Sequence, residues 1–100
     1  MFENEINLQV TGDAMAPEIL EEDILTVDQN EMPKPNGKDL AVFTFNGEKV
    51  VCRYTKYGSQ YLLLFANAPI SVVNSDRAEI LGKVVLIKEN HLAGNKMDFA

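Results

Sequence analysis

Cysteine and long apolar runs are scarce in these 100 residues, and each scarcity excludes a class of protein. A single cysteine, Cys52, rules out an internal disulfide and suits a reducing cytoplasm. No apolar run approaches the length of a membrane span, and the acidic start at residues 1–5 is unlike a secretory signal. We therefore expect a cytoplasmic protein without a membrane segment.

Basic side chains are also few: 9 lysines and arginines stand against 15 aspartates and glutamates, giving a formal net charge of −6. A surface of that sign repels phosphate backbones, so this chain is not expected to bind DNA or RNA by itself. Low-complexity tracts and repeats are absent as well, and the length suits one domain. We place this domain at residues 1–90. Residues 91–100 have no periodicity and are expected to form a flexible tail.

Most of the chain has the pattern of short strands separated by turn residues. One helical turn is expected at residues 16–20, with Pro17 near its start. Gly82 is expected to mark a bulge in the last strand, and residues 29–37, with two prolines and an Asn-Gly pair, form a surface loop. The segments with strand character are residues 8–10, 24–27, 40–45, 50–54, 61–65 and 80–89. The fold class is therefore all-β, with at most one or two short helical turns.

The strongest local signal is the Asn46-Gly47 pair between two apolar runs. Asn-Gly favours a two-residue hairpin turn because both central positions require positive φ. Counting outward from that turn places Ala41 opposite Cys52, and a second hairpin is expected around residues 56–60. The two-residue period of a strand puts Val50, Cys52 and Tyr54 on one face and Val51 and Arg53 on the other.

Five segments in order carry a resemblance that none of them carries alone. The first contains Gly12-Asp13-Ala14-Met15, followed by Pro17 and Ile19. The others are residues 22–28 (EDILTVD), 36–42 (NGKDLAV), 48–54 (EKVVCRY) and 80–85 (ILGKVV). Their order and spacing resemble the LexA and lambda-type phage repressor C-terminal domain, a family of self-cleaving serine–lysine peptidases related to signal peptidases. The resemblance covers about residues 8–89 and implies a LexA-like fold of twisted hairpins.

The departures from the family pattern concern its chemistry. The family uses a serine hydroxyl as nucleophile and a buried, neutral lysine that accepts its proton. Ala14 stands at the serine position and Cys52 at the lysine position, so both halves of the dyad are missing. An engineered Ser→Ala would explain the first loss but not the second. The resemblance thus implies a catalytically dead domain, with Ala14 and Cys52 as vestigial dyad positions. The neighbouring motif residues are Gly12, Asp13 and Met15, and Asp13 is expected to bond backbone amides through its side chain.

Two further features differ from cleavable relatives. The connection at residues 65–70 is short, whereas the corresponding region of those relatives is typically longer and rich in proline. No Ala-Gly or Cys-Gly cleavage bond precedes the motif, and the helix-turn-helix with which such repressors read operators is absent from these residues. DNA contact is therefore expected only through an N-terminal domain outside this chain.

Other chemistry was weighed at two places. Cys52 could be a nucleophile or a redox switch, but the single histidine, His91, falls in the expected tail, and a small buried hydrophobe is the simpler interpretation. The acidic residues Glu18, Glu21, Glu22 and Asp23 lack the ligand spacing of a calcium loop, so they are interpreted as a solvated turn. No metal and no cofactor are expected.

The last strand has apolar residues on both faces, which is unusual for an edge strand. Either it is a fully buried central strand, or a second subunit covers one side of it. The family commonly dimerises through this strand, so the resemblance implies a homodimer. The expected interface residues are Lys83, Val84, Val85, Leu86, Ile87, Lys88 and Glu89.

Three functions remain open from the sequence. The first is the dimerisation and regulatory domain of a bacterial or prophage repressor, induced by an antirepressor protein instead of self-cleavage. The second is a self-cleaving serine–lysine peptidase inactivated by an engineered change at Ala14. The third is a free-standing pseudo-peptidase that binds peptides in the former substrate groove.

Overall fold

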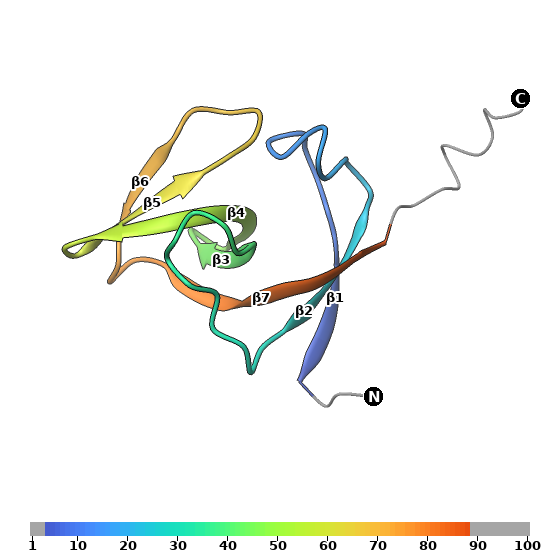
Figure 1. The fold of residues 1–100 in the computed structure, drawn as a ribbon, viewed down its shortest axis with the longest axis horizontal. Coiled ribbons are helices and arrows are strands. Elements are labelled where there is room, and N and C mark those ends of the chain that lie inside the picture. The colour runs from blue at the N-terminus through green and yellow to red at the C-terminus, as the bar shows by residue number, and fades with distance from the viewer. Residues whose placement is uncertain (1–3, 89–100) are drawn as a thin grey trace, which may run out of the picture.

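The computed structural model describes residues 4–88, which form seven antiparallel strands and no helix. The strands are β1 (Glu5–Gln9), β2 (Ile24–Asp28), β3 (Ala41–Phe45), β4 (Glu48–Tyr57), β5 (Gln60–Leu64), β6 (Ser71–Asn74) and β7 (Glu79–Lys88). Their order in the sheet is β1-β2-β7-β3-β4-β5-β6, which places β1 and β6 at its two edges (Figure 1). The all-β prediction is confirmed. The tail predicted at residues 91–100 lies outside the described residues.

The β3–β4 hairpin has the register that its turn predicts. Asn46 and Gly47 have φ angles of 54° and 77°, the left-handed pair that a two-residue turn needs. Ala41 lies opposite Cys52, as counting outward from the turn requires. The second predicted hairpin is also present, because β4 pairs with β5 through a turn between Tyr57 and Gln60.

Two local predictions need correction. Residues 14–18 form a series of turns instead of a helical turn at residues 16–20, with one α-type bond from the Ile19 N–H to the Met15 carbonyl (3.0 Å). A single helical turn makes too few hydrogen bonds to offset the conformational entropy lost when its residues are ordered. Burial of the Met15 and Ile19 side chains therefore determines the path of the chain here. Strand β6 was not predicted, because four residues after Pro69 with polar ends give little periodicity.

Strand β7 lies inside the sheet, between β2 and β3. Its first half pairs with β3, its second half pairs with β2, and Lys83 is the one residue paired with both. The predicted bulge is present, since the register with β3 skips Leu81 next to Gly82. A Cβ at Gly82 would lie 2.6 Å from the backbone oxygen of Asp28, so the close approach of β2 requires glycine there.

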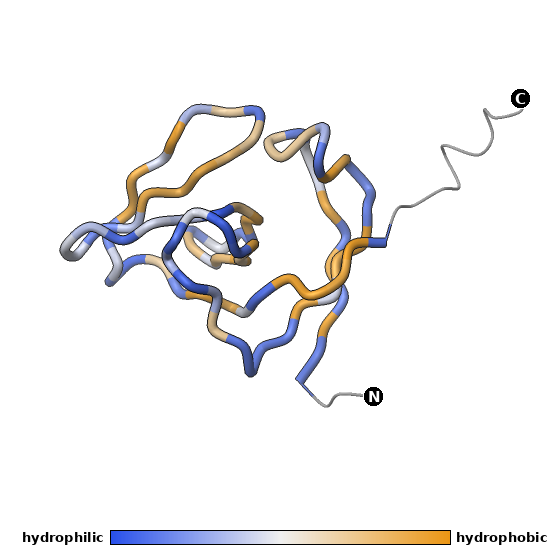
Figure 2. Tube along the Cα trace, viewed as in Figure 1, coloured by the Kyte–Doolittle hydropathy of each residue, from blue (hydrophilic) through white to orange (hydrophobic). Residues whose placement is uncertain are grey.

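The buried side chains form two clusters on either side of the β3–β4 hairpin. The aliphatic cluster comprises Met15, Ile19, Leu25, Val27, Val42 and Val84. The aromatic cluster comprises Ala41, Phe43, Cys52, Tyr54, Leu63 and Ala78, with Tyr61 packed against it. Figure 2 shows hydrophobic residues along the second half of β7, whereas hydrophilic residues gather in the loop that follows β2.

Three rings organise the aromatic cluster. The centroids of Phe43 and Tyr54 are 5.1 Å apart, as are those of Phe43 and Tyr61, and each pair meets edge to face. Edge-to-face contacts of this kind add to the free energy gained from burial alone. The Tyr54 hydroxyl is satisfied by donating to the Pro33 carbonyl at 2.6 Å, which also ties the loop after β2 to this cluster.

Candidate functional site

The loop that carries Ala14 is held by the connection between β5 and β6. Asn67 donates its backbone N–H to the Ala14 carbonyl (2.8 Å) and its side-chain amide to the Asp13 carbonyl (3.1 Å). The Asp13 carbonyl also accepts the N–H of Ala16 at 3.1 Å. These two loops meet at the top of the view in Figure 1, although they are more than fifty residues apart in the chain. The connection at residues 65–70 therefore positions the motif.

A carboxylate does organise this turn, but it is not the predicted one. Among the residues that the structure describes, none makes a hydrogen bond with the Asp13 side chain, which is exposed; Asp13 contributes its backbone carbonyl instead. The buried carboxylate is Asp23, which accepts the N–H of Leu20 at 2.9 Å. An Asp three residues after the N–H that it binds closes the turn locally. The expected role thus belongs to Asp23.

An ion pair fixes the other side of the loop. Nη1 and Nη2 of Arg53 donate to the two carboxylate oxygens of Glu18, each at 2.6 Å, and Nε donates to the Lys38 carbonyl at 3.0 Å. Hydrogen bonding to Arg53 lowers the pKa of Glu18 and, reciprocally, raises that of Arg53. The two parallel N–H···O bonds form a bidentate, charge-assisted pair, which adds geometric specificity.

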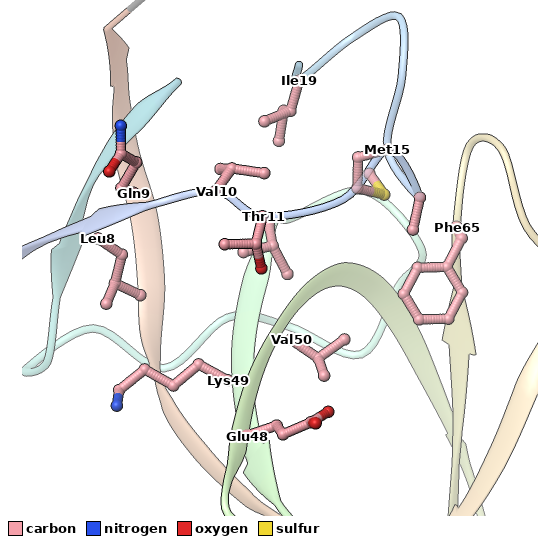
Figure 3. A pocket seen from close by; sticks show the side chains of 12 residues that line it. Leu8, Gln9, Val10, Thr11, Met15, Ile19, Glu48, Lys49, Val50 and Phe65 are labelled. Atoms are coloured by element: carbon pink, nitrogen blue, oxygen red, sulfur yellow. The ribbon is translucent and has the colours of Figure 1, made fainter. Parts of the chain in front are cut away.

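A cleft of about 580 Å³ opens beside Ala14. One wall comes from β1 and the following loop, with Leu8, Val10 and Thr11, and the facing wall comes from β4, with Lys49 and Val50 (Figure 3). Phe65 closes one end. The lining is mainly apolar with a few polar groups, which is the usual character of a site for small molecules or peptides.

The structure separates the two positions that the resemblance assigns to the dyad. Ala14 lines the cleft, whereas Cys52 is completely buried in the aromatic cluster and does not line it. Burial raises the pKa of the Cys52 thiol to about 12, against a smaller lowering by its backbone hydrogen bond at Leu64. The thiol is therefore protonated at neutral pH, and thiol chemistry needs the thiolate. Arg53, on the opposite face of β4, is bound to Glu18 and does not lower this pKa.

The predicted acidic turn has two parts. Glu21 and Glu22 are exposed, as a solvated turn requires, but Glu18 is paired with Arg53 and Asp23 is buried. No group of histidine, cysteine, aspartate and glutamate side chains in residues 4–88 is arranged to hold a metal ion. Within the same residues, no helix is long and apolar enough to cross a membrane.

The sequence model of the Peptidase S24-like family matches residues 3–85. The chain belongs to this family. No curated protein sequence matches the chain. The S24-like family includes self-cleaving members, and the match spans the Ala14 loop, the cleft and most of β7.

Sequence reasoning missed the residues that support the motif of this S24-like domain. Asn67 gave no signal, because its partners lie far along the chain. Arg53 could have been found, since the hairpin period places it on the face opposite Cys52, where a carboxylate partner would be expected. Of the predicted interface residues, Val85 and Leu86 are 46% and 51% exposed, Val84 is buried, and Glu89 lies outside the described residues.

Proposed function

We propose that this domain is the dimerisation and regulatory module of a bacterial or prophage transcriptional repressor, and that it has no peptidase activity. One observation carries the catalytic half of the proposal. Ala14 stands in the wall of the cleft at the position that the resemblance assigns to the nucleophile, while Cys52, at the position assigned to the lysine, is buried in the aromatic cluster with a protonated thiol. A methyl group cannot attack a carbonyl, and a buried neutral thiol cannot accept its proton.

The dimerisation half rests on β7. Its pairing with β3 ends at Lys83, followed by one more bond from the Val84 N–H to the Leu40 carbonyl (3.0 Å). Beyond this point β7 has only β2 beside it among residues 4–88. Val85 and Leu86 are about half exposed on this stretch. Pairing across a two-fold axis would cover both the free edge and these side chains.

In this proposal the dimer holds two DNA-binding heads, supplied by an N-terminal helix-turn-helix domain outside this chain, at half-site spacing. Operator affinity then depends on dimerisation. A repressor that does not cleave itself needs another route to induction, and a protein antirepressor that binds this domain provides one.

The absence of peptidase activity is tested by incubation at alkaline pH followed by intact-mass measurement. We expect no self-cleavage and no cleavage of added peptides. Specific fragments that disappear in a Cys52→Ala variant would contradict the proposal and favour a cysteine peptidase.

Dimerisation is tested by sedimentation across micromolar concentrations. We expect a homodimer that Val85→Glu dissociates without loss of the β signature in circular dichroism, because the charge faces the partner. Val72→Glu is the matched control, since Val72 is similarly exposed (57%) but lies on β6. A wild type that stays monomeric over this range would exclude self-association through this domain.

A second candidate function is supported by one observation. Lys49 lines the same cleft as Ala14, so the cleft contains an amine, although not at the position where the family has its lysine. If residue 14 is serine in the natural protein, Lys49 could act as its base and the domain would be a self-cleaving peptidase. Cleavage restored by Ala14→Ser and lost again on adding Lys49→Ala would establish this alternative.

A further inference from the structure

A second groove lies at the edge of the sheet remote from β1. It has a volume of about 420 Å³ and runs between strand β6 and the turn of the β3–β4 hairpin. Phe45 and Asn46 line it on the hairpin side, and Val72, Asn74 and Arg77 line it on the β6 side. Neither the Ala14 cleft nor β7 contributes to this groove. It is therefore a separate feature of the surface.

The backbone of β6 presents unused hydrogen-bonding groups to this groove. In an antiparallel pair, residues alternate between those whose backbone faces the partner strand and those whose backbone faces away. Ser75 donates to the carbonyl of Ser59, directly opposite in the register (2.8 Å), so the Ser75 and Val73 backbones face β5. Val72 and Asn74 consequently point their N–H groups away from β5. Within residues 4–88 neither N–H has a recorded acceptor.

Apolar side chains flank this open edge. Val72 is 57% exposed, and Leu62 lies beside it on β5. Ile70, just before the strand, is 58% exposed. An added strand that pairs with β6 would place its side chains against Val72 on one face, in the way that neighbouring strands of a sheet stabilise one another. The edge thus offers both backbone bonds and apolar surface.

The charge of the groove selects among extended segments. Among the described residues, Arg77 is the only charged one that lines it, in a protein whose formal net charge is −6. The ion pairs recorded in the described part of the chain do not involve Arg77. A carboxylate would therefore find a free guanidinium here, and a basic segment would be repelled.

We propose that β6 is a docking edge for an extended segment of a partner protein, which pairs with Val72 and Asn74 and places an aspartate or glutamate against Arg77. Self-pairing of β6 fits less well. In an antiparallel pair of two copies centred on Val72, Arg77 would face residues 65–70 of the other copy, and these include no acid and contain Pro69. This inference is independent of the dimer and of catalytic inactivity.

The probe is a set of fluorescein-labelled octapeptides in which valine and threonine alternate and one position carries glutamate, moved along the peptide. A matched set carries lysine instead. Fluorescence anisotropy with the whole chain is expected to give saturable binding for at least one glutamate peptide, and binding at least about tenfold weaker for its lysine counterpart. No saturable binding of any glutamate peptide up to about 1 mM overturns the proposal.

Two charge reversals locate the site. Arg77→Glu is expected to weaken binding of the glutamate peptide at least about tenfold and to favour the lysine peptide. Lys49→Glu, which changes a cation of the Ala14 cleft, is expected to leave both affinities unchanged. The opposite result would place the peptide in the Ala14 cleft and overturn the proposal. Circular dichroism confirms that both variants keep the fold.

Amide hydrogen exchange supplies a readout that needs no variant. The bound peptide is expected to slow exchange at Val72 and Asn74 at least about tenfold, while Val73, already bonded to β5, changes little. Unchanged exchange at Val72 and Asn74 with peptide bound overturns the proposal. Protection of these two amides that rises with protein concentration and no peptide would identify a second copy as the occupant and overturn it too.

Discussion

Ala14 and Cys52, the two departures from the family motif, lie in opposite kinds of surroundings. Ala14 lies in an open cleft wall, on a loop that Asn67 holds at one side and the Glu18–Arg53 pair holds at the other. Cys52 is fully buried among Ala41, Phe43 and Leu63, and this burial is the main cause of its raised pKa. A side chain at position 14 therefore faces the cleft, whereas a side chain at position 52 is enclosed in the hydrophobic core.

The comparison predicts first that Cys52 cannot be converted to lysine without a large loss of stability. Cys52→Lys adds volume and an amine to a closed apolar cluster, so the free energy of unfolding should fall by about 4 kcal/mol. Burial lowers the pKa of that lysine, so the loss should be larger at neutral pH than at alkaline pH, where the lysine of the unfolded chain also loses its proton. Urea unfolding followed by circular dichroism measures it, with Cys52→Ala, expected to cost about 1 kcal/mol, as the control. A Cys52→Lys variant as stable as wild type would mean that this cluster opens to the cleft.

The second prediction concerns the strand shared by both regions. Gly82→Ala places a Cβ against the backbone oxygen of Asp28, so it should separate β7 from β2 and cost about 2–3 kcal/mol. Gly58→Ala is the control, because its Cβ meets open space and only the φ of 62° is unfavourable, which costs about 1 kcal/mol. Equal urea midpoints for the two variants would show that β2 can move away from β7 freely.

The third prediction uses the raised pKa of the Cys52 thiol. Its folded-state pKa of about 12 exceeds the ordinary value of 9.0, so the folded chain keeps a proton that the unfolded chain releases in between. This stabilisation is complete below pH 9 and is lost as pH rises toward 12. Linkage gives a loss of about 1.4 kcal/mol by pH 10.

The measurement compares the free energy of unfolding of wild type with that of Cys52→Ala. Burial also raises the pKa of Tyr54, but this affects the pH dependence of both proteins in the same direction and so cancels in the comparison. The difference in their free energies of unfolding should shrink between pH 8 and pH 10. Native protein should also resist a thiol reagent that modifies the urea-unfolded chain. Rapid labelling of the native thiol would place Cys52 in contact with solvent.

The smallest expected effect is at the Ala14 loop. Glu18→Gln removes a partly exposed ion pair and should cost about 0.5 kcal/mol, after allowance for screening by solvent. Because the folded-state pKa of Glu18 is lowered from 4.5, this contribution is present above that value and is lost as pH falls through the folded-state pKa. Unfolding at pH 7 and at pH 3, with exposed Glu21→Gln as control, tests this. Equal effects of the two substitutions at pH 7 would mean that the ion pair does not hold the loop.

The sequence predicted the parts of the fold that short-range rules determine. The Asn46-Gly47 turn gave the β3–β4 register, and the period along β4 correctly separated Cys52 from Arg53. Strand β6 could not be predicted, because its pairing with β5 is a tertiary contact across a loop that contains Pro69. The cleft likewise depends on tertiary contacts between segments that are distant in the chain. The resemblance therefore located Ala14 and Cys52 in the sequence but did not reveal that, of the two, only Ala14 lines the cleft.

The position of β7 has a consequence for synthesis of the protein. Val27 pairs with Val84, 57 positions later in the chain, and Ala41 pairs with Lys83. During translation β2 and β3 therefore leave the ribosome long before the strand that joins them, and the apolar side of β2 waits without its partner. If translation stopped after β6, strands β3 to β6 could pair with one another and β1 could pair with β2, but β7, the strand that joins these two groups in the sheet, would be missing. Ribosome-bound chains ending before residue 79 should consequently be far more sensitive to protease than chains with β7 fully emerged.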